Sequence, residues 1–233
     1  MKNTPLNKLK DMMQELKEIK IIQEKHDERT VLRARKISNR MRFYAISGND
    51  YPLKALLASG ENPNQTETDG KTLLMWAAEY GNDTTVGILL DFGADINAQN
   101  YIGWSALMWA AQEQYVKSVR VLIFRGANPN LRDRNNDTAL LSAVGQKNND
   151  EVIKDLLSAG CEVNACNDEG KTALMLAAKY GSINTVRMLL KSGADIGLID
   201  NEGRDALDYA SKANRNDTLG TLRASLSKDF LKM

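Results

Sequence analysis

The stretch that decides the fold is DGKTLLMWAAEYGNDTTVGILLDFGADIN, residues 69–97. In its first half, Leu74, Ala77 and Ala78 recur at helical spacing, so they share one face of a predicted helix. Thr72 can cap the start of this helix with its hydroxyl, because the first backbone amides of a helix have no partner within it. The first half therefore predicts a short helix whose small side chains allow a neighbouring helix to approach closely.

The second half of the stretch predicts a second, antiparallel helix. Gly81 is placed to end the first helix, as glycines commonly do. Val86, Leu89 and Leu90 form the apolar face of the second helix. One helix pair of this size cannot bury both apolar faces by itself, so it requires similar neighbours on which to stack.

The same pattern recurs along the chain at a fixed period. Related segments begin at Ile102, Asn135 and Glu169. The glycines that follow each second apolar block are Gly60, Gly93, Gly126, Gly160 and Gly193, with spacings of 33, 33, 34 and 33 residues. The one extra residue falls in the polar segment 145–151, where an insertion disturbs little. A period of this length indicates a protein of stacked repeats.

These units resemble the ankyrin repeat family, whose unit is a helix pair followed by a protruding β-hairpin turn. The resemblance covers about residues 36–226, and it implies an all-α solenoid of helix pairs with short β-hairpin-like loops. We expect an N-terminal amphipathic helix at residues 1–35 and an array of about six ankyrin repeats at residues 36–233. The expected repeats are 36–66, which is degenerate, 67–99, 100–132, 133–166, 167–199, and 200–233, which caps the C-terminal end.

One position departs from the family pattern. The first helix of an ankyrin repeat commonly opens with Thr-Pro-Leu-His, and this sequence has Met75, Met108 and Met175 in the place of the histidine. We expect each replacement to lose one hydrogen bond, worth about 1 kcal/mol, and to substitute flexible apolar packing.

The composition is that of an ordinary globular protein. The 233 residues are 42% hydrophobic and 26% charged, and the net charge of +1 gives no general attraction to nucleic acid or to an anionic membrane. No apolar run approaches the roughly 18 residues of a membrane span, and the N-terminus has no apolar signal-peptide stretch. Cys161 and Cys166 are too few for a disulfide framework and suit a reducing compartment. We expect an intracellular, cytoplasmic protein.

The sequence offers no recognisable catalytic or metal-binding set. Its one histidine, His26, stands among charged residues without the partners of a base or ligand. No Cys/His cluster has zinc spacing, and no glycine-rich loop could hold a phosphate. Carboxylates such as Asp95 and Asp200 recur with the period, so we interpret them as turn residues. We expect no enzymatic activity, no cofactor, no metal and no small-molecule substrate.

The resemblance implies a protein-binding surface, which ankyrin arrays form from their hairpin tips and the exposed side of their first helices. The candidate contact residues are Asp69, Lys71, Tyr101, Ile102, Trp104, Arg134 and Asn135 at the tips, and Tyr80, Gln112 and Glu113 on the first helices. Most other tips are polar, so Tyr101, Ile102 and Trp104 form an unusual apolar tip. The alternative for Trp104 is that it folds back on a neighbouring hairpin.

Two further tryptophans have a different interpretation. Trp76 and Trp109 precede paired alanines, where an apolar residue usually lies partly buried between first helices, and we interpret them as core residues. The aromatic residues of this region therefore divide into a predicted core pair and a predicted contact group.

The leading functional hypothesis is a monomeric, non-enzymatic protein–protein interaction module without nucleic-acid partners. A second hypothesis is an adaptor or regulatory subunit that docks in an assembly through residues 1–35, where Leu6, Leu9 and Met13 share an apolar face. The same helix could instead cap the first repeat, and the sequence leaves both readings open. Short ankyrin proteins also occur in bacteria, where some look like host-directed effectors that would act in a host cytosol.

The apolar tip generates a prediction. We expect Trp104→Ala to leave the fold intact and to weaken partner binding at least about tenfold, because an aromatic anchor often contributes about 2 kcal/mol or more to an interface. Binding can be measured beside the wild-type chain, with circular dichroism as the check on folding. Full binding by a well-folded variant would count against this role of Trp104.

Overall fold

A computed structural model of the protein describes residues 35–36, 38–144 and 150–230, the last three by their backbone alone. The chain divides into two compact units, residues 1–43 and 44–233. Of the N-terminal helix predicted at residues 1–35, all but residue 35 lies outside the described residues, so that helix and its role stay predictions. The described residues 38–47 are helical.

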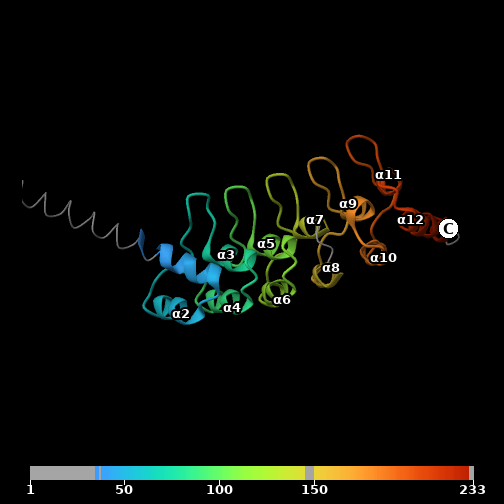
Figure 1. Cartoon of the computed structure of the whole chain (residues 1–233). Helices are drawn as coiled ribbons and strands as arrows, with labels where there is room; N and C mark the ends of the chain where they lie inside the picture. Colours follow the sequence, from blue (N-terminus) through green and yellow to red (C-terminus); the bar gives the residue numbers. More distant parts are fainter. Residues whose placement is uncertain (1–34, 37, 145–149, 231–233) are drawn as a thin grey trace, which may run out of the picture. The chain divides into compact units, whose positions relative to one another are not determined.

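The second unit is a row of helix pairs, shown in Figure 1. The first helices of the pairs are α3 (Leu73–Glu79), α5 (Ala106–Gln112), α7 (Ala139–Val144), α9 (Ala173–Tyr180) and α11 (Ala206–Lys212). The second helices are α2 (Asp50–Ala58), α4 (Asp83–Asp91), α6 (Val116–Phe124), α8 (Asp150–Ser158), α10 (Ile183–Lys191) and α12 (Asn216–Phe230). First helices pack on first helices and second helices on second helices, which makes two layers.

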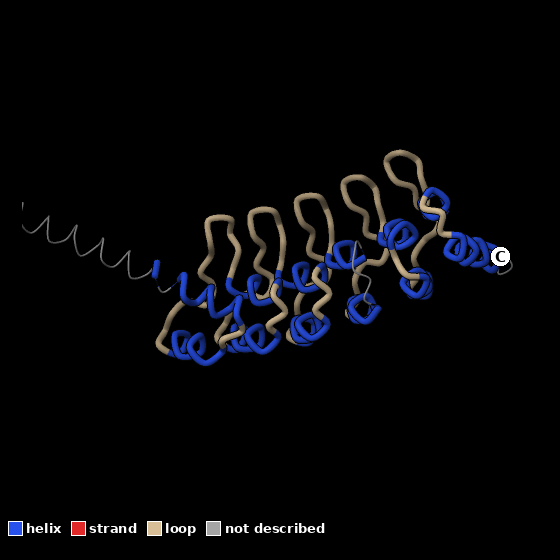
Figure 2. Tube along the Cα trace, viewed as in Figure 1, coloured by secondary structure: helices blue, strands red, loops and turns tan. Residues whose placement is uncertain are grey.

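Hairpin-like loops connect successive pairs and project from the layer of first helices, as Figure 2 shows. The described residues form no named strand, and two isolated antiparallel bridges lie at the bases of hairpins, between Thr66 and Thr72 and between Cys166 and Thr172. The predicted fold, an all-α solenoid of ankyrin-type repeats, is confirmed.

The core lies between the two layers and along the row. Leu74, Ala77 and Ala78 of α3 are completely buried, as are Val86 and Leu89 of α4. The equivalent positions of the pairs α5–α6, α7–α8 and α9–α10 are buried in the same way, whereas in the last pair only Ala210 and Leu222 are buried. The apolar faces predicted from residues 69–97 are therefore the faces that stack.

The first helices begin with side-chain caps at the predicted positions. Hydroxyl oxygens of Thr72, Ser105 and Thr172 each accept a hydrogen bond from the amide three residues later, at 3.2–3.4 Å. In return, the sulfurs of Met75, Met108 and Met175 accept the amide hydrogen of the capping residue at 3.4–3.5 Å. The expectation that methionine forfeits this hydrogen bond therefore needs correction: the amide keeps an acceptor, although a thioether sulfur is a weak one.

Neighbouring hairpins are joined by single backbone hydrogen bonds. The amides of Tyr101, Arg134, Asp168 and Asn201 donate to the carbonyls of Asp69, Ile102, Asn135 and Glu169, respectively, at 2.9–3.1 Å. Inside each of these hairpins, one side chain holds the turn: Asp200 Oδ1, for example, accepts the amides of Glu202 and Arg204, both at 2.9 Å. The prediction that Asp200 is a turn residue is confirmed.

A second set of contacts joins the turns at the other end of the repeats. Asparagine Oδ1 atoms of Asn64, Asn97, Asn130 and Asn164 accept amides of Asp95, Asn128, Glu162 and Asp195 in the next repeat, at 2.7–2.9 Å. Each repeat is thus fastened to the next at the hairpins, in the helix layers and at these turns.

Two glycines allow two constraints on the residue type to be told apart: a left-handed backbone conformation and the close approach of a neighbouring hairpin. Gly103 and Gly126 have φ angles of 84° and 88°, in the left-handed region. A Cβ added at Gly103 would lie 2.7 Å from the Cα of Asp133 in the next hairpin, whereas nothing lies within 4 Å of a Cβ at Gly126.

We therefore expect Gly126→Ala to lower the free energy of unfolding by about 1 kcal/mol, from backbone strain alone. Gly103→Ala should lower it by about 3 kcal/mol, because the neighbouring hairpin must also shift. Urea denaturation of the two variants measures the difference. Equal losses would contradict the close approach of the hairpins at Gly103.

Candidate protein-binding surface

The apolar tip of the α4–α5 hairpin faces solvent in part. Tyr101 is 62% exposed and Ile102 is 49% exposed. One side of the Tyr101 ring is covered, since a Cβ added at Gly70 of the preceding hairpin would lie 2.8 Å from its Cδ1 atom. The tip therefore presents an apolar pair whose tyrosine is already held against the neighbouring hairpin.

The other predicted contact residues divide by exposure. Those exposed to solvent are Asp69, Tyr80, Gln112, Arg134 and Asn135, and Glu113 is half-buried. Of the predicted set, Lys71 and Trp104 do not stand free at the tips, and the structure brings both of them against the ring of Trp109.

Lys71 is a buried residue, so the prediction that it is a surface contact is wrong. Its exposed fraction is 4%. The ammonium lies 3.7 Å from the ring centroid of Trp76 and 3.9 Å from that of Trp109, and it is ion-paired with Glu79. Two ring faces and a carboxylate replace the water that the cation loses on burial. The two tryptophans are half-buried, as predicted.

Trp104 takes the alternative position, folded back on the next hairpin. Its ring packs on Trp109 with the centroids 4.5 Å apart, and its Nε1 donates to Oδ2 of Asp133 at 3.0 Å. The expectation of a freely exposed Trp104 is therefore wrong. The expectation that Trp104→Ala affects binding alone changes accordingly: the chain should still fold, but with lower stability, because the variant removes a hydrogen bond worth about 1 kcal/mol and an aromatic contact.

The buried cation generates a prediction for stability. Lys71→Met keeps the length of the side chain but removes the charge between the two rings, so we expect it to lower the free energy of unfolding by about 2 kcal/mol. The chain's three tryptophans, Trp76, Trp104 and Trp109, all lie in this cluster. Intrinsic fluorescence during urea denaturation therefore reports the loss directly.

Lys54→Met is the matched control, because Lys54 is an exposed lysine of α2. Its replacement should change stability by less than about 0.5 kcal/mol. If Lys71→Met proves equally neutral, the ammonium contributes no stability between the rings.

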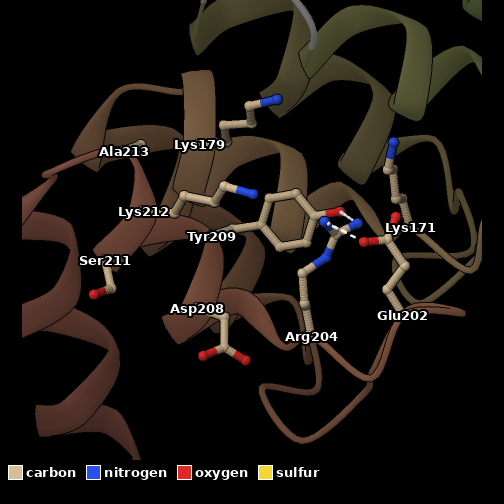
Figure 3. A pocket seen from close by; sticks show the side chains of 9 residues that line it. All are labelled: Lys171, Lys179, Glu202, Arg204, Asp208, Tyr209, Ser211, Lys212 and Ala213. Carbon is tan, nitrogen blue, oxygen red and sulfur yellow. Dashed lines mark hydrogen bonds and ion pairs between the residues drawn. The ribbon is translucent and has the colours of Figure 1, made fainter.

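At the other end of the row, a hollow of about 820 Å³ opens beside α9 and α11. Figure 3 shows the residues that line it, among them the cations Lys171, Lys179, Arg204 and Lys212 around the ring of Tyr209. The predicted contact set does not include these residues. The sequence contains a pattern that could have indicated this cluster of cations. Lys171 and Arg204 occupy one position of the repeat, and Lys179 and Lys212 occupy another.

One carboxylate organises the hairpin side of this hollow. Oδ2 of Asp200 accepts hydrogen bonds from Nε of Arg204 at 2.9 Å and from the hydroxyl of Tyr209 at 2.7 Å. Burial by itself would raise the pKa of Asp200, but the hydrogen bonds from Arg204 and Tyr209 outweigh it and lower that pKa. Burial and the Asp200 contact raise the pKa of Tyr209 to about 12. At neutral pH, Asp200 is therefore charged and Tyr209 is neutral.

The cysteines are unpaired, and their surroundings differ. Cys161 is half-buried, and burial raises the pKa of its thiol to about 11, so it is a poor nucleophile at neutral pH. Cys166 is exposed.

In the described part of the chain, no group of three or more His, Cys, Asp or Glu side chains is arranged to hold a metal ion. None of the helices in residues 38–144 and 150–230 combines the length and apolarity needed to cross a membrane.

Comparison with known proteins agrees with the geometry. A family model described as ankyrin repeats (three copies) matches residues 43–133 and again residues 135–230. The chain therefore belongs to the ankyrin repeat family. No curated protein matches the sequence. Ankyrin repeats are a protein–protein interaction module and a non-enzymatic scaffold.

Solved structures with the same fold cover most of this chain. One is a chain of the complex between the predatory endopeptidase Bd0816 of Bdellovibrio bacteriovorus and the immunity protein Bd3460, with 30% identity, a TM-score of 0.71, and coverage of 79% of this chain and 96% of that chain. The ankyrin repeat domain ABAYE2397 of Acinetobacter baumannii AYE has 27% identity, a TM-score of 0.71, and coverage of 80% and 97%. The ankyrin repeat domain of Bcl-3, of the IkappaB family, has 29% identity, a TM-score of 0.69, and coverage of 78% and 81%.

Proposed function

We propose that this protein binds a target protein through the hairpin tip of Tyr101 and Ile102 together with the adjoining exposed side of α3 and α5. The observation that carries the proposal is the exposure of these two side chains, 62% and 49%, next to each other at one tip. Adjacent apolar side chains at a position where the other hairpins are mostly polar form a patch that a partner can cover.

The geometry of the tip favours binding energetically. The Tyr101 ring lies against Gly70, and the Tyr101 amide is bonded to the carbonyl of Asp69. A side chain that is already held loses less conformational freedom when a partner covers it. Exposed neighbours, among them Tyr80 and Gln112 on the first helices, would supply the polar rim of such a contact.

The family relationship supports a protein partner and a role without catalysis. One similar structure is a complex of an endopeptidase with an immunity protein, and another belongs to the IkappaB family. We place the protein in the cytoplasm, because both described cysteines are unpaired and free thiols persist in a reducing compartment.

The tip is tested by giving it the polar character of the other hairpins. We expect Tyr101→Asn combined with Ile102→Asn to leave stability within about 1 kcal/mol of the wild-type chain and to weaken binding at least about tenfold, because two apolar anchors are lost. The target is first identified by affinity capture from the source cells with mass spectrometry. Its affinity for each variant is then measured with purified proteins by isothermal titration calorimetry.

The control is Phe124→Asn, which removes an apolar side chain that is 88% exposed at the end of α6, in the other helix layer. This variant should bind the target like the wild-type chain. A tip variant that is folded and binds with unchanged affinity overturns the proposal, and so does an equal loss in Phe124→Asn.

A further inference from the structure

The hollow beside α9 and α11 holds two kinds of cation. Lys171 is ion-paired with Glu169 at 2.6 Å, and Arg204 is ion-paired with Asp200 at 2.8 Å and with Glu202 at 2.7 Å. These two cations are therefore neutralised by residues of their own hairpins, and their positions are held by those contacts.

Lys179 and Lys212 differ from this pair. Among the described residues, neither has a carboxylate within ion-pair distance. Lys179 lies over the ring of Tyr180, with its ammonium 4.4 Å from the centroid. Asp208 stands one helical turn before Lys212, but its carboxylate accepts the amide of Asp205 at the start of α11, at 3.1 Å. Among the described residues, the ammonium groups of Lys179 and Lys212 therefore have no ion-pair partner, although the carboxylates of Glu202 and Asp208 also line the hollow.

Lys179 and Lys212 line the same hollow as the ring of Tyr209. Figure 3 shows Lys212 directed toward the ring of Tyr209, whereas the ammonium of Lys179 is directed away from that ring. The Tyr209 hydroxyl is engaged with Asp200 and, because its pKa is raised to about 12, it adds no negative charge at neutral pH. An anionic group that enters the hollow would meet two unpaired lysines and a neutral ring, with the exposed carboxylate of Asp208 also in the lining and that of Glu202 already paired with Arg204.

Charge changes along the row at this position of the repeat. The residue that follows the paired small side chains is Glu79 in α3, Gln112 in α5, Lys179 in α9 and Lys212 in α11. At this position the first helices therefore change from Glu79, which is half-buried and ion-paired with Lys71, to the exposed lysines of α9 and α11. A partner segment that lies along these helices fits best when its acidic part lies over α9 and α11.

We propose that this hollow, lined also by Tyr209, binds a carboxylate of an acidic partner segment between Lys179 and Lys212. This inference rests on the proposed function, because it names the chemistry of the partner for the same face. A carboxylate is favoured over a phosphate because the guanidinium of Arg204, the group that suits phosphate best, is already engaged by Asp200. Lysine ammonium groups are compact point charges that need no planar, bidentate partner.

The test uses the full chain and a peptide of six glutamates with blocked ends as the probe. Binding is followed by NMR shifts of 15N-labelled backbone amides, which detect weak association and report its place. We expect saturable shifts confined to α9, α11 and their hairpins. Lys179→Gln combined with Lys212→Gln should weaken the apparent affinity at least about tenfold, and increasing salt should weaken wild-type binding.

A matched control removes the same charge elsewhere. Lys154→Gln combined with Lys191→Gln changes two exposed lysines of the neighbouring second helices α8 and α10, and it should bind the peptide like the wild-type chain. An equal loss in this control means that the peptide responds to net charge only, which overturns the proposal. Shifts that persist unchanged in the Lys179/Lys212 variant also overturn it.

Two further probes test the chemistry. A peptide of six glutamines with blocked ends should cause no shifts, and inorganic phosphate at equal concentration should cause weaker shifts than the glutamate peptide. Equal binding of the glutamine peptide would mean that charge plays no role in recognition. Equal or stronger binding of phosphate would mean that the hollow selects phosphate and not a carboxylate. Either result overturns the proposal. The tip variant of Tyr101 and Ile102 should bind the glutamate peptide normally, so failure at the tip and failure at this hollow are separate results.

Discussion

The structure depends on the contact between one repeat and the next. A single helix pair leaves two apolar faces uncovered, and stacking covers them while each hairpin amide finds the carbonyl of the preceding hairpin. Close approach is a condition of this arrangement: at Gly103, a Cβ would meet the backbone of Asp133. The asparagines of the opposite turns, such as Asn64 and Asn164, fasten the same neighbours at the other end. Caps, core and hairpins are consequences of one repeated interface.

This interface also decides which residues remain for recognition. Positions that recur in every unit are occupied by stacking, so recognition falls to positions where the units differ. Tyr101 and Ile102 stand where other hairpins are mostly polar, and Lys179 and Lys212 stand where α3 and α5 carry Glu79 and Gln112. The two surfaces lie on the same array but have different chemistry, one apolar and one cationic. A single extended partner could use both.

Most of the fold was predictable, because it follows from local and periodic features. Thr72 caps α3, Gly81 follows its end, and the buried faces are those that helical spacing indicated. The methionines were less predictable, since their sulfurs still accept an amide hydrogen. The candidate surface was predicted only in part: Tyr101 and Ile102 are exposed, whereas Lys71 and Trp104 are drawn inward by contacts with residues of other repeats.

The comparison of Lys71 with Lys171 shows what the sequence determines and what only the tertiary structure determines. Both occupy the same position of the repeat, and the period alone determined that position, the helix pairs and the membership of a stacked family. Only the tertiary structure decided that Lys71 is buried between Trp76 and Trp109, while Lys171 lines an open hollow beside Glu169. The physical reason is that periodicity records contacts which every unit repeats, whereas burial of one side chain depends on which neighbours the adjoining units place around it.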